Sequence, residues 1–234
     1  MALLVLAALA LGATTQVSVN FANAPASIDG AQLYFYDSGG RLIAKATVNG
    51  TTARATIDNA NSYLVKLDAK TLYALFAFPS GSSSITFNFS KAAAINVTVK
   101  ATGGFVYTPS GPIEYTAAIT VGTSLVNTTV SSVKTLYATP AVRIWLPEHL
   151  LFPSVYGFKL TGITLNGAPV ENGFTISTAG SYEIEATYEF SGLPWWVFAG
   201  IAALAVLLIA ALAARGRSAR TAMALAEASE WLEE

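Results

Sequence analysis

The stretch WWVFAGIAALAVLLIAALAA, residues 195–214, decides the architecture of this chain because none of its twenty residues carries a charge. At about 1.5 Å per residue, a helix of this length reaches about 30 Å, the thickness of the hydrocarbon core of a bilayer. Pro194 suits the first turn of a helix, and Trp195 and Trp196 suit the headgroup boundary of a membrane. The stretch therefore predicts one membrane-spanning helix over residues 194–214.

Three arginines close this stretch on its carboxyl side: Arg215, Arg217 and Arg220. Lys and Arg close to the end of a span are retained on the cytoplasmic side of the membrane. We therefore expect residues 215–234 to form a short cytoplasmic tail and the preceding part of the chain to lie outside the cell. The two tryptophans and the three arginines then anchor the helix at the two membrane surfaces.

The amino-terminal segment is consistent with export. Residues 2–11 form an unbroken run of Ala, Leu and Val that is too short to span a bilayer, and Ala10 and Gly12 are small enough for signal cleavage. This pattern predicts a signal peptide over residues 1–12. Because no Lys or Arg follows Met1, a buried amino-terminal strand or helix is the alternative.

The composition of the exported part excludes several classes of site. The chain has no Cys, so it can form no disulfide, no thiolate metal site and no cysteine nucleophile. Residues 16–191 carry ten basic and ten acidic side chains, and no basic stripe that would attract nucleic acid. The exported part has about 180 residues, which is enough to bury a hydrophobic core without disulfide bonds.

Apolar residues alternate with polar ones along most of this part, which is typical of half-buried β-strands. The segment ATGGFVYTPSGP, residues 101–112, interrupts the pattern with Gly and Pro. The pattern predicts an all-β protein with two tandem Ig-like or transthyretin-like sandwich domains, residues 13–100 and 113–191, joined by a linker at 101–112. The predicted strands are 17–21, 33–36, 42–48, 53–57, 63–67, 72–78, 85–89, 95–99, 113–121, 125–133, 136–138, 142–146, 158–165, 174–177 and 182–190.

Local signals refine this prediction. Residues 72–78 are almost wholly apolar, as expected of a strand buried on both faces. The clusters DSGG at 37–40 and NG at 166–167 predict tight turns. Residues 147–153, PEHLLFP, predict an irregular apolar crossing. The pentapeptide KTLYA occurs at 70–74 and again at 134–138, which raises the hypothesis that the two halves are duplicated.

Part of the first half resembles a known family. A strand GAQLYFY at 30–36, the Asp/Gly turn that follows, Asn49-Gly50 and the strand SYLVK at 62–66 are similar to the transthyretin-like or carboxypeptidase-regulatory-like sandwich. The resemblance covers residues 28–67. It implies a non-catalytic, seven-stranded module of the kind often appended to surface proteins.

Residues with catalytic potential are few. His149 is the only His in the chain and lies in an apolar segment bounded by prolines. A zinc site with two His ligands is therefore excluded. Glu183 and Glu185 share one face of a predicted strand, where paired carboxylates bind calcium or act as acid and base, although an exposed polar face is the simpler interpretation. We expect no enzyme activity, no cofactor and no metal.

Four sequons are present, with acceptors at Asn49, Asn88, Asn96 and Asn127. The motif Asn-X-Ser/Thr accepts N-linked glycans on surface segments of exported proteins. These residues are therefore candidate glycosylation sites, and they agree with the topology inferred from the arginines.

Together these patterns predict a type I, single-pass protein of the cell membrane with a structural or binding role at the cell surface. Its expected partners are the lipid bilayer and other envelope or membrane proteins, and the pattern sets no oligomeric state. The alternative is an accessory subunit of a membrane complex that contacts its partners through the helix and tail. Leu225, Ala228 and Leu232 form a narrow apolar stripe if the tail is helical, but a solvated end fits equally well. A membrane-tethered hydrolase that uses His149 or the Glu183/Glu185 pair is a third hypothesis.

Overall fold

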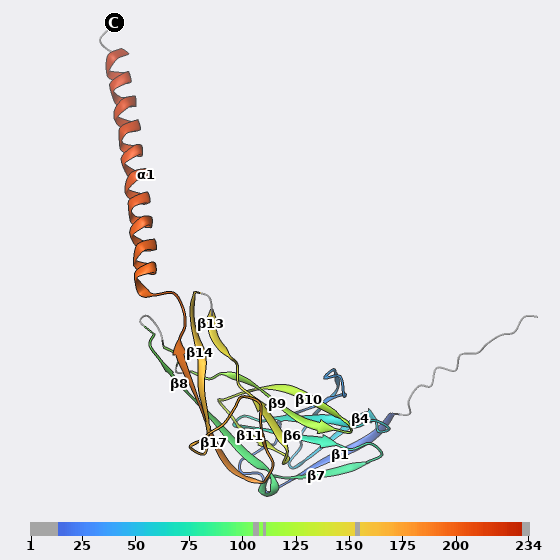
Figure 1. Ribbon diagram of the computed structural model, residues 1–234. Coiled ribbons are helices and arrows are strands. Elements are labelled where there is room, and N and C mark those ends of the chain that lie inside the picture. Colours follow the sequence, from blue (N-terminus) through green and yellow to red (C-terminus); the bar gives the residue numbers. More distant parts are fainter. Residues whose placement is uncertain (1–13, 105–107, 110, 153–154, 231–234) are drawn as a thin grey trace, which may run out of the picture. The chain divides into compact units, whose positions relative to one another are not determined.

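The computed structural model describes residues 14–104, 108–109, 111–152 and 155–230 (Figure 1). The predicted signal peptide, residues 1–12, lies outside these residues. The described chain consists of β-strands followed by one carboxyl-terminal α-helix. The predicted all-β class with an apolar helix at its end is thereby confirmed.

The strands agree closely with the alternation in the sequence. Each predicted strand has a counterpart whose ends lie within three residues of the expected ones, because the period of two marks which residues face the core. The strands are β1 (Thr14–Ala22), β2 (Gln32–Tyr36), β3 (Leu42–Thr47), β4 (Thr52–Asp58), β5 (Tyr63–Asp68), β6 (Leu72–Phe78), β7 (Ser84–Asn88), β8 (Ala93–Thr102), β9 (Glu114–Val121), β10 (Ser124–Ser131), β11 (Thr135–Ala138), β12 (Val142–Trp145), β13 (His149–Phe152), β14 (Tyr156–Leu165), β15 (Ala168–Pro169), β16 (Phe174–Ile176) and β17 (Gly180–Phe190).

These strands form three sheets. A ten-stranded sheet has the order β13-β14-β17-β8-β11-β6-β5-β2-β3, with β15 paired to β14. A three-stranded sheet has the order β4-β1-β7, and a four-stranded sheet has the order β10-β9-β12-β16. A 3₁₀ turn, η1 (Phe89–Lys91), connects β7 to β8.

Strand β6 lies at the centre of the packing. Phe76 stacks on Phe87 of β7 at 4.8 Å between ring centroids and meets Phe21 of β1 edge-on at 6.1 Å. The alternate residues Tyr73 and Leu75 are buried outside this cluster, and β6 contacts β9 of the four-stranded sheet. The ten-stranded sheet is therefore covered on one face by β1 and β7 and on the other by β9, which confirms the prediction that residues 72–78 are buried on both faces.

Strand pairing joins the two halves of the sequence. Strand β11 lies between β6, to which it is parallel, and β8, to which it is antiparallel. Strand β17 runs parallel to β8 over its whole length, from the pair Gly180 and Ala93 to the pair Glu189 and Thr102. Strands that precede the segment 101–112 are thus hydrogen-bonded to strands that follow it, although the sequence predicts a domain boundary there.

The local signals have mixed outcomes. The hairpin at 37–40 joins β2 to β3 as predicted, and the turn at Asn166 and Gly167 has positive φ at both residues (50° and 81°), as a type I′ turn requires. The irregular crossing predicted at 147–153 is wrong in part, because His149–Phe152 forms β13 next to β14. Among the described strands, β13 has one neighbour and therefore lies at an edge of its sheet, where proline is tolerated.

The chain divides into two compact units. Residues 1–150 and 158–190 belong to the first, which holds nearly all of the strands. Residues 151–157 and 191–234 belong to the second, which holds the helix α1 (Trp195–Glu230).

Candidate membrane anchor and polar sites

The first part of α1 has the properties of a membrane anchor. The segment Trp195–Arg215 is 21 residues long, has a mean hydropathy of 2.7, and contains no residue that is buried against the other described residues. Its large side chains are exposed on every side, including Leu204, Val206, Leu207, Leu208 and Ile209. A helix that is apolar all round is stable only when an apolar environment surrounds it. Among the described residues, this is the one segment long and apolar enough to cross a membrane.

The predicted anchoring residues lie at the two ends of this segment. The carbonyl of Pro194 accepts a hydrogen bond from the amide of Val197 at 3.0 Å, which forms the first turn. Trp195 and Trp196 are each 63% exposed in that turn. Arg215 ends the apolar segment, and Arg217 and Arg220 follow within the same helix. The helix continues to residue 230, so the backbone of the predicted tail is helical as far as it is described.

A second segment lies against the start of the helix within the same unit. The amide of Ser191 donates to the carbonyl of Gly157 at 2.9 Å, and the amide of Leu193 donates to the carbonyl of Val155 at 2.7 Å. The ring of Tyr156 meets Phe198 edge-on with 6.2 Å between centroids. Sequence reasoning missed this contact, and its only signal was the unusual apolar content of residues 147–153.

A polar hollow of about 580 Å³ lies in the first unit, where several loops meet. The β2–β3 hairpin contributes Asp37 and Arg41, the β4–β5 loop contributes Asp58, and the β9–β10 turn contributes Gly122 and Thr123. The carboxylates of Asp37 and Asp58 accept hydrogen bonds from residues of their own loops. The side chain of Asp58 accepts from the amide of Ala60 and from the side-chain nitrogen of Asn61, each at 3.0 Å.

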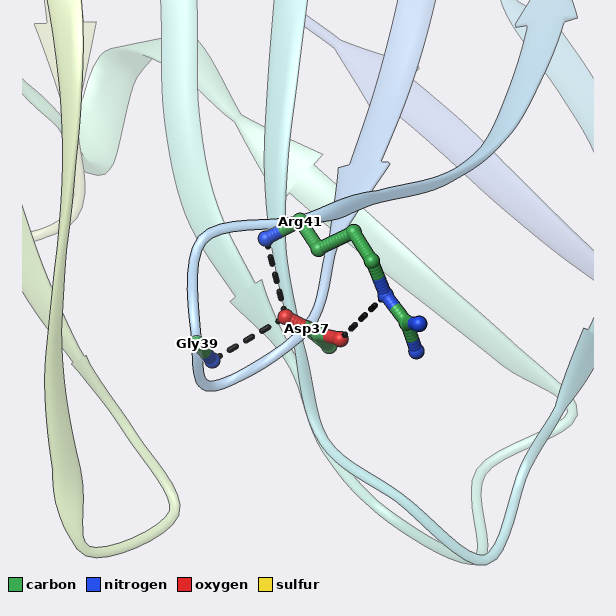
Figure 2. Close-up of polar contacts among 3 residues, drawn as sticks. All are labelled: Asp37, Gly39 and Arg41. Carbon is green, nitrogen blue, oxygen red and sulfur yellow. Dashed lines mark hydrogen bonds and ion pairs between the residues drawn. The ribbon is translucent and has the colours of Figure 1, made fainter.

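Asp37 holds the hairpin together in the same manner (Figure 2). Its Oδ1 accepts from the amides of Gly39 at 3.0 Å and Arg41 at 2.9 Å, and its Oδ2 pairs with Nε of Arg41 at 3.2 Å. These contacts, the amide of Arg41 foremost, lower the pKa of the Asp37 carboxyl below its ordinary value against the effect of desolvation. A carboxylate committed to its own turn stabilises the loop and is a poor acid or base.

A cluster of lysines and tyrosines connects the ten-stranded sheet to the four-stranded sheet. The Nζ atoms of Lys66 and Lys134 lie 4.9 and 4.7 Å from the ring centroid of Tyr73. Lys134 also pairs with Asp68 at 2.5 Å, and Lys66 donates to the carbonyl of Thr129 in β10 at 2.6 Å. Burial lowers the pKa of Lys66, and the neighbouring Lys134 adds to this shift, whereas Asp68 opposes it. The contacts hold β10 against β5, which indicates a structural cluster.

One signal for this cluster is visible in the sequence, namely the Lys within the otherwise apolar strand at 63–67. The sequence does not show which residues Lys66 contacts. Lys66 and Lys134 come from opposite halves of the sequence, and only the placement of β11 beside β6 brings them to the same ring.

The four sequon asparagines have different surroundings. Asn49 lies exposed in the β3–β4 turn, and Asn127 lies exposed on β10, which is an edge strand of its sheet. Asn88 is half-buried, and its side-chain oxygen accepts from the amide and hydroxyl of Ser90. Asn96 is half-buried in β8, where its Nδ2 donates to Glu183 at 2.9 Å. Glycosylation stays a prediction, and the geometry favours Asn49 and Asn127 as acceptors.

The remaining acid–base candidates are separated or paired. His149 is exposed on β13. Glu183 accepts from Asn96, and Glu185 pairs with Lys100 at 2.6 Å, so each has a partner on β8. Over the residues that the structure describes, no group of three or more His, Asp or Glu side chains is arranged to hold a metal ion.

Comparisons with known proteins add little to this geometry. No protein-family model matches the chain, and no curated protein matches it. A search of solved structures finds the major pilin from Streptococcus pyogenes at 12% identity, covering 76% of this chain and 98% of the pilin, with a TM-score of 0.22. A likeness at this level carries no argument about either fold or function. The transthyretin-like resemblance of residues 28–67 stays a prediction.

Proposed function

We propose that this chain is a type I, single-pass membrane protein whose β-rich part lies outside the cell and has a structural or binding role at the cell surface. The observation that carries the proposal is the segment Trp195–Arg215, which is apolar on all sides and contains no buried residue. Burying such a segment in lipid removes its side chains from water at a gain of roughly 25 cal/mol per Å². The arginines after the segment favour a cytoplasmic tail.

The polar groups of the β-rich part support a structural or binding role. Asp37 and Asp58 close their own loops, Lys66 connects β5 to β10, and Lys134 pairs with Asp68. Glu185 is occupied by Lys100. Charges used in this way stabilise a scaffold, whereas acid–base catalysis needs a group that is free to meet a substrate.

The topology can be tested directly because the chain has no native Cys. We expect Leu125→Cys, on the exposed part of β10, to react with a membrane-impermeant maleimide on intact cells. Ala222→Cys, in the tail, should react only after the cells are permeabilised. Alkaline carbonate should leave both variants in the membrane pellet. The reverse labelling pattern, or release of the chain by carbonate, would contradict the proposal.

One observation favours the accessory-subunit alternative as a second function. Helix α1 continues for fifteen residues after Arg215, which corresponds to about 22 Å beyond the apolar segment. A helix that extends into the cytoplasm offers a surface to another subunit. If this function is correct, the chain purified in mild detergent should carry a stoichiometric integral membrane protein, and truncation after Gly216 should release it. A chain that purifies alone from native membranes would count against it.

A further inference from the structure

The unit that contains the helix exposes large apolar side chains outside the helix as well. Leu151 is 49% exposed, Val155 is 47% exposed and Leu193 is 37% exposed. All three belong to the same compact unit as Trp195 and Trp196, the first residues of the apolar segment. We call Leu151, Val155 and Leu193 the apolar collar.

The collar is fixed to the start of the helix by backbone hydrogen bonds. The bond from Leu193 to Val155 and the bond from Ser191 to Gly157 are two residues apart on both segments, which is the spacing of an antiparallel pair. In that register Val155 and Leu193 are opposite one another, and opposite residues of an antiparallel pair present their side chains to the same face. Leu193 lies two residues before Trp195, so the position of Val155 is tied to the point where the apolar segment begins.

Two further contacts support this arrangement. The ring of Tyr156 packs against Phe198, which lies in the first turns of the apolar segment. Leu151 has a φ of 62°, in the left-handed region that a leucine rarely adopts. Residues held in such sparsely populated backbone conformations cluster at functional sites.

We propose that the apolar collar inserts into the interfacial layer of the bilayer that α1 crosses, as a second membrane contact beside the helix. This inference rests on the proposed function, since it assumes that the apolar segment spans lipid. Continuity argues for lipid as the occupant: Val155 is hydrogen-bonded to Leu193, and the tryptophans that follow belong to the type of residue enriched at the headgroup level. Apolar side chains at such a position enter the headgroup and acyl boundary by about 5–10 Å.

The test uses the full chain reconstituted in phosphatidylcholine vesicles, with one environment-sensitive fluorophore per variant. Val155→Cys reports on the collar and Leu207→Cys on the middle of the apolar segment. Val133 lies between β10 and β11 and is 68% exposed. Val133→Cys is therefore the matched control, because it labels an exposed valine that does not belong to the collar. Each variant is titrated with lipids that carry a nitroxide either near the headgroup or near the end of the acyl chain.

We expect the label at 155 to be quenched more strongly by the shallow nitroxide, the label at 207 more strongly by the deep nitroxide, and the label at 133 by neither. A quenched label at 207 with an unquenched label at 155 would overturn the collar and leave the anchor intact. Unquenched labels at both sites would overturn the anchor, and the collar with it. A label at 155 that is shielded from aqueous iodide but untouched by either lipid would assign the collar to a protein partner or a second copy, which also overturns the inference.

Discussion

Replacement of Leu136 by alanine tests whether the two halves of the chain unfold together. Leu136 is fully buried in β11, which is hydrogen-bonded to β6 on one side and to β8 on the other. Leu→Ala substitutions in cores cost about 2–5 kcal/mol, and the cost is greatest where the surroundings cannot collapse into the cavity. Two paired neighbours hold β11 in place, so we expect the upper part of this range, about 3–5 kcal/mol. Since about 1.4 kcal/mol is a factor of ten, the opening equilibrium should change by at least about 10²-fold.

The measurement is native-state hydrogen exchange of the full chain in detergent micelles. We expect the most protected amides of β5, in the first half, and of β9, in the second half, to lose protection by the same factor in Leu136→Ala. Val133→Ala is the control, because an exposed side chain should change stability by less than about 0.5 kcal/mol. Wild-type protection in β5 together with reduced protection in β9 would refute the reasoning, and would show that the halves open as separate domains at 101–112.

Two other expectations concern single polar groups. Tyr188 and Tyr115 are both buried, but the hydroxyl of Tyr188 donates to the carbonyl of Pro147 at 2.7 Å, whereas that of Tyr115 has no partner among the described residues. Tyr188→Phe should therefore lower the free energy of unfolding by about 1 kcal/mol in urea titrations, while Tyr115→Phe should leave it unchanged or raise it; an equal loss in both would contradict this. Because the pKa of Asp37 is lowered in the folded state, its stabilising contribution is present above the ordinary Asp pKa of about 3.9 and is lost as the pH falls through the folded pKa. The amide resonance of Gly39 should titrate with a midpoint below about 3.9, and Asp37→Asn should abolish that transition; a midpoint at or above the ordinary value would refute the role of the hairpin contacts.

Much of the strand structure could be predicted because its signals are local. Alternation of apolar and polar residues marks β4, where Ala53, Ala55 and Ile57 are buried and their neighbours are not. The continuous apolar run of β6 indicated burial on both faces for the same reason. Asp37 lies two residues before the first glycine of its turn, and a short acidic side chain there accepts the amides that follow it.

The arrangement of the strands could not be predicted in this way. Alternation shows which face of a strand is buried but does not name the strand beside it, and β11 lies next to β6 although more than fifty residues separate them. For the same reason the cluster around Tyr73 could not be predicted, since Lys134 reaches that ring only because β11 pairs with β6. Strand β13 was missed because prolines on both sides favour irregular structure, and a strand with a single neighbour tolerates them.

The apolar collar could not be predicted from the sequence for a different reason. A twenty-residue apolar run is recognisable by length alone, whereas isolated residues such as Leu151 and Val155 resemble ordinary core residues. Their exposure, and the hydrogen bond from Leu193 to Val155, become visible only when the backbone of residues 155–157 is placed beside residues 191–193.

The repeated pentapeptide KTLYA occupies two neighbouring strands of one sheet, and duplication of the two halves stays a hypothesis. Duplicated domains would place the two copies at equivalent positions in two sheets, but here they belong to β6 and β11, parallel neighbours in one sheet. The register pairs Leu136 with Tyr73 and Tyr137 with Ala74, so the two tyrosines lie on opposite faces. Tyr73 meets the lysines, whereas Tyr137 packs edge-on against Phe89 at 5.2 Å. Both copies lie in central strands of one sheet, where residues with an apolar body suit burial, and this shared environment accounts for their likeness without duplicated domains.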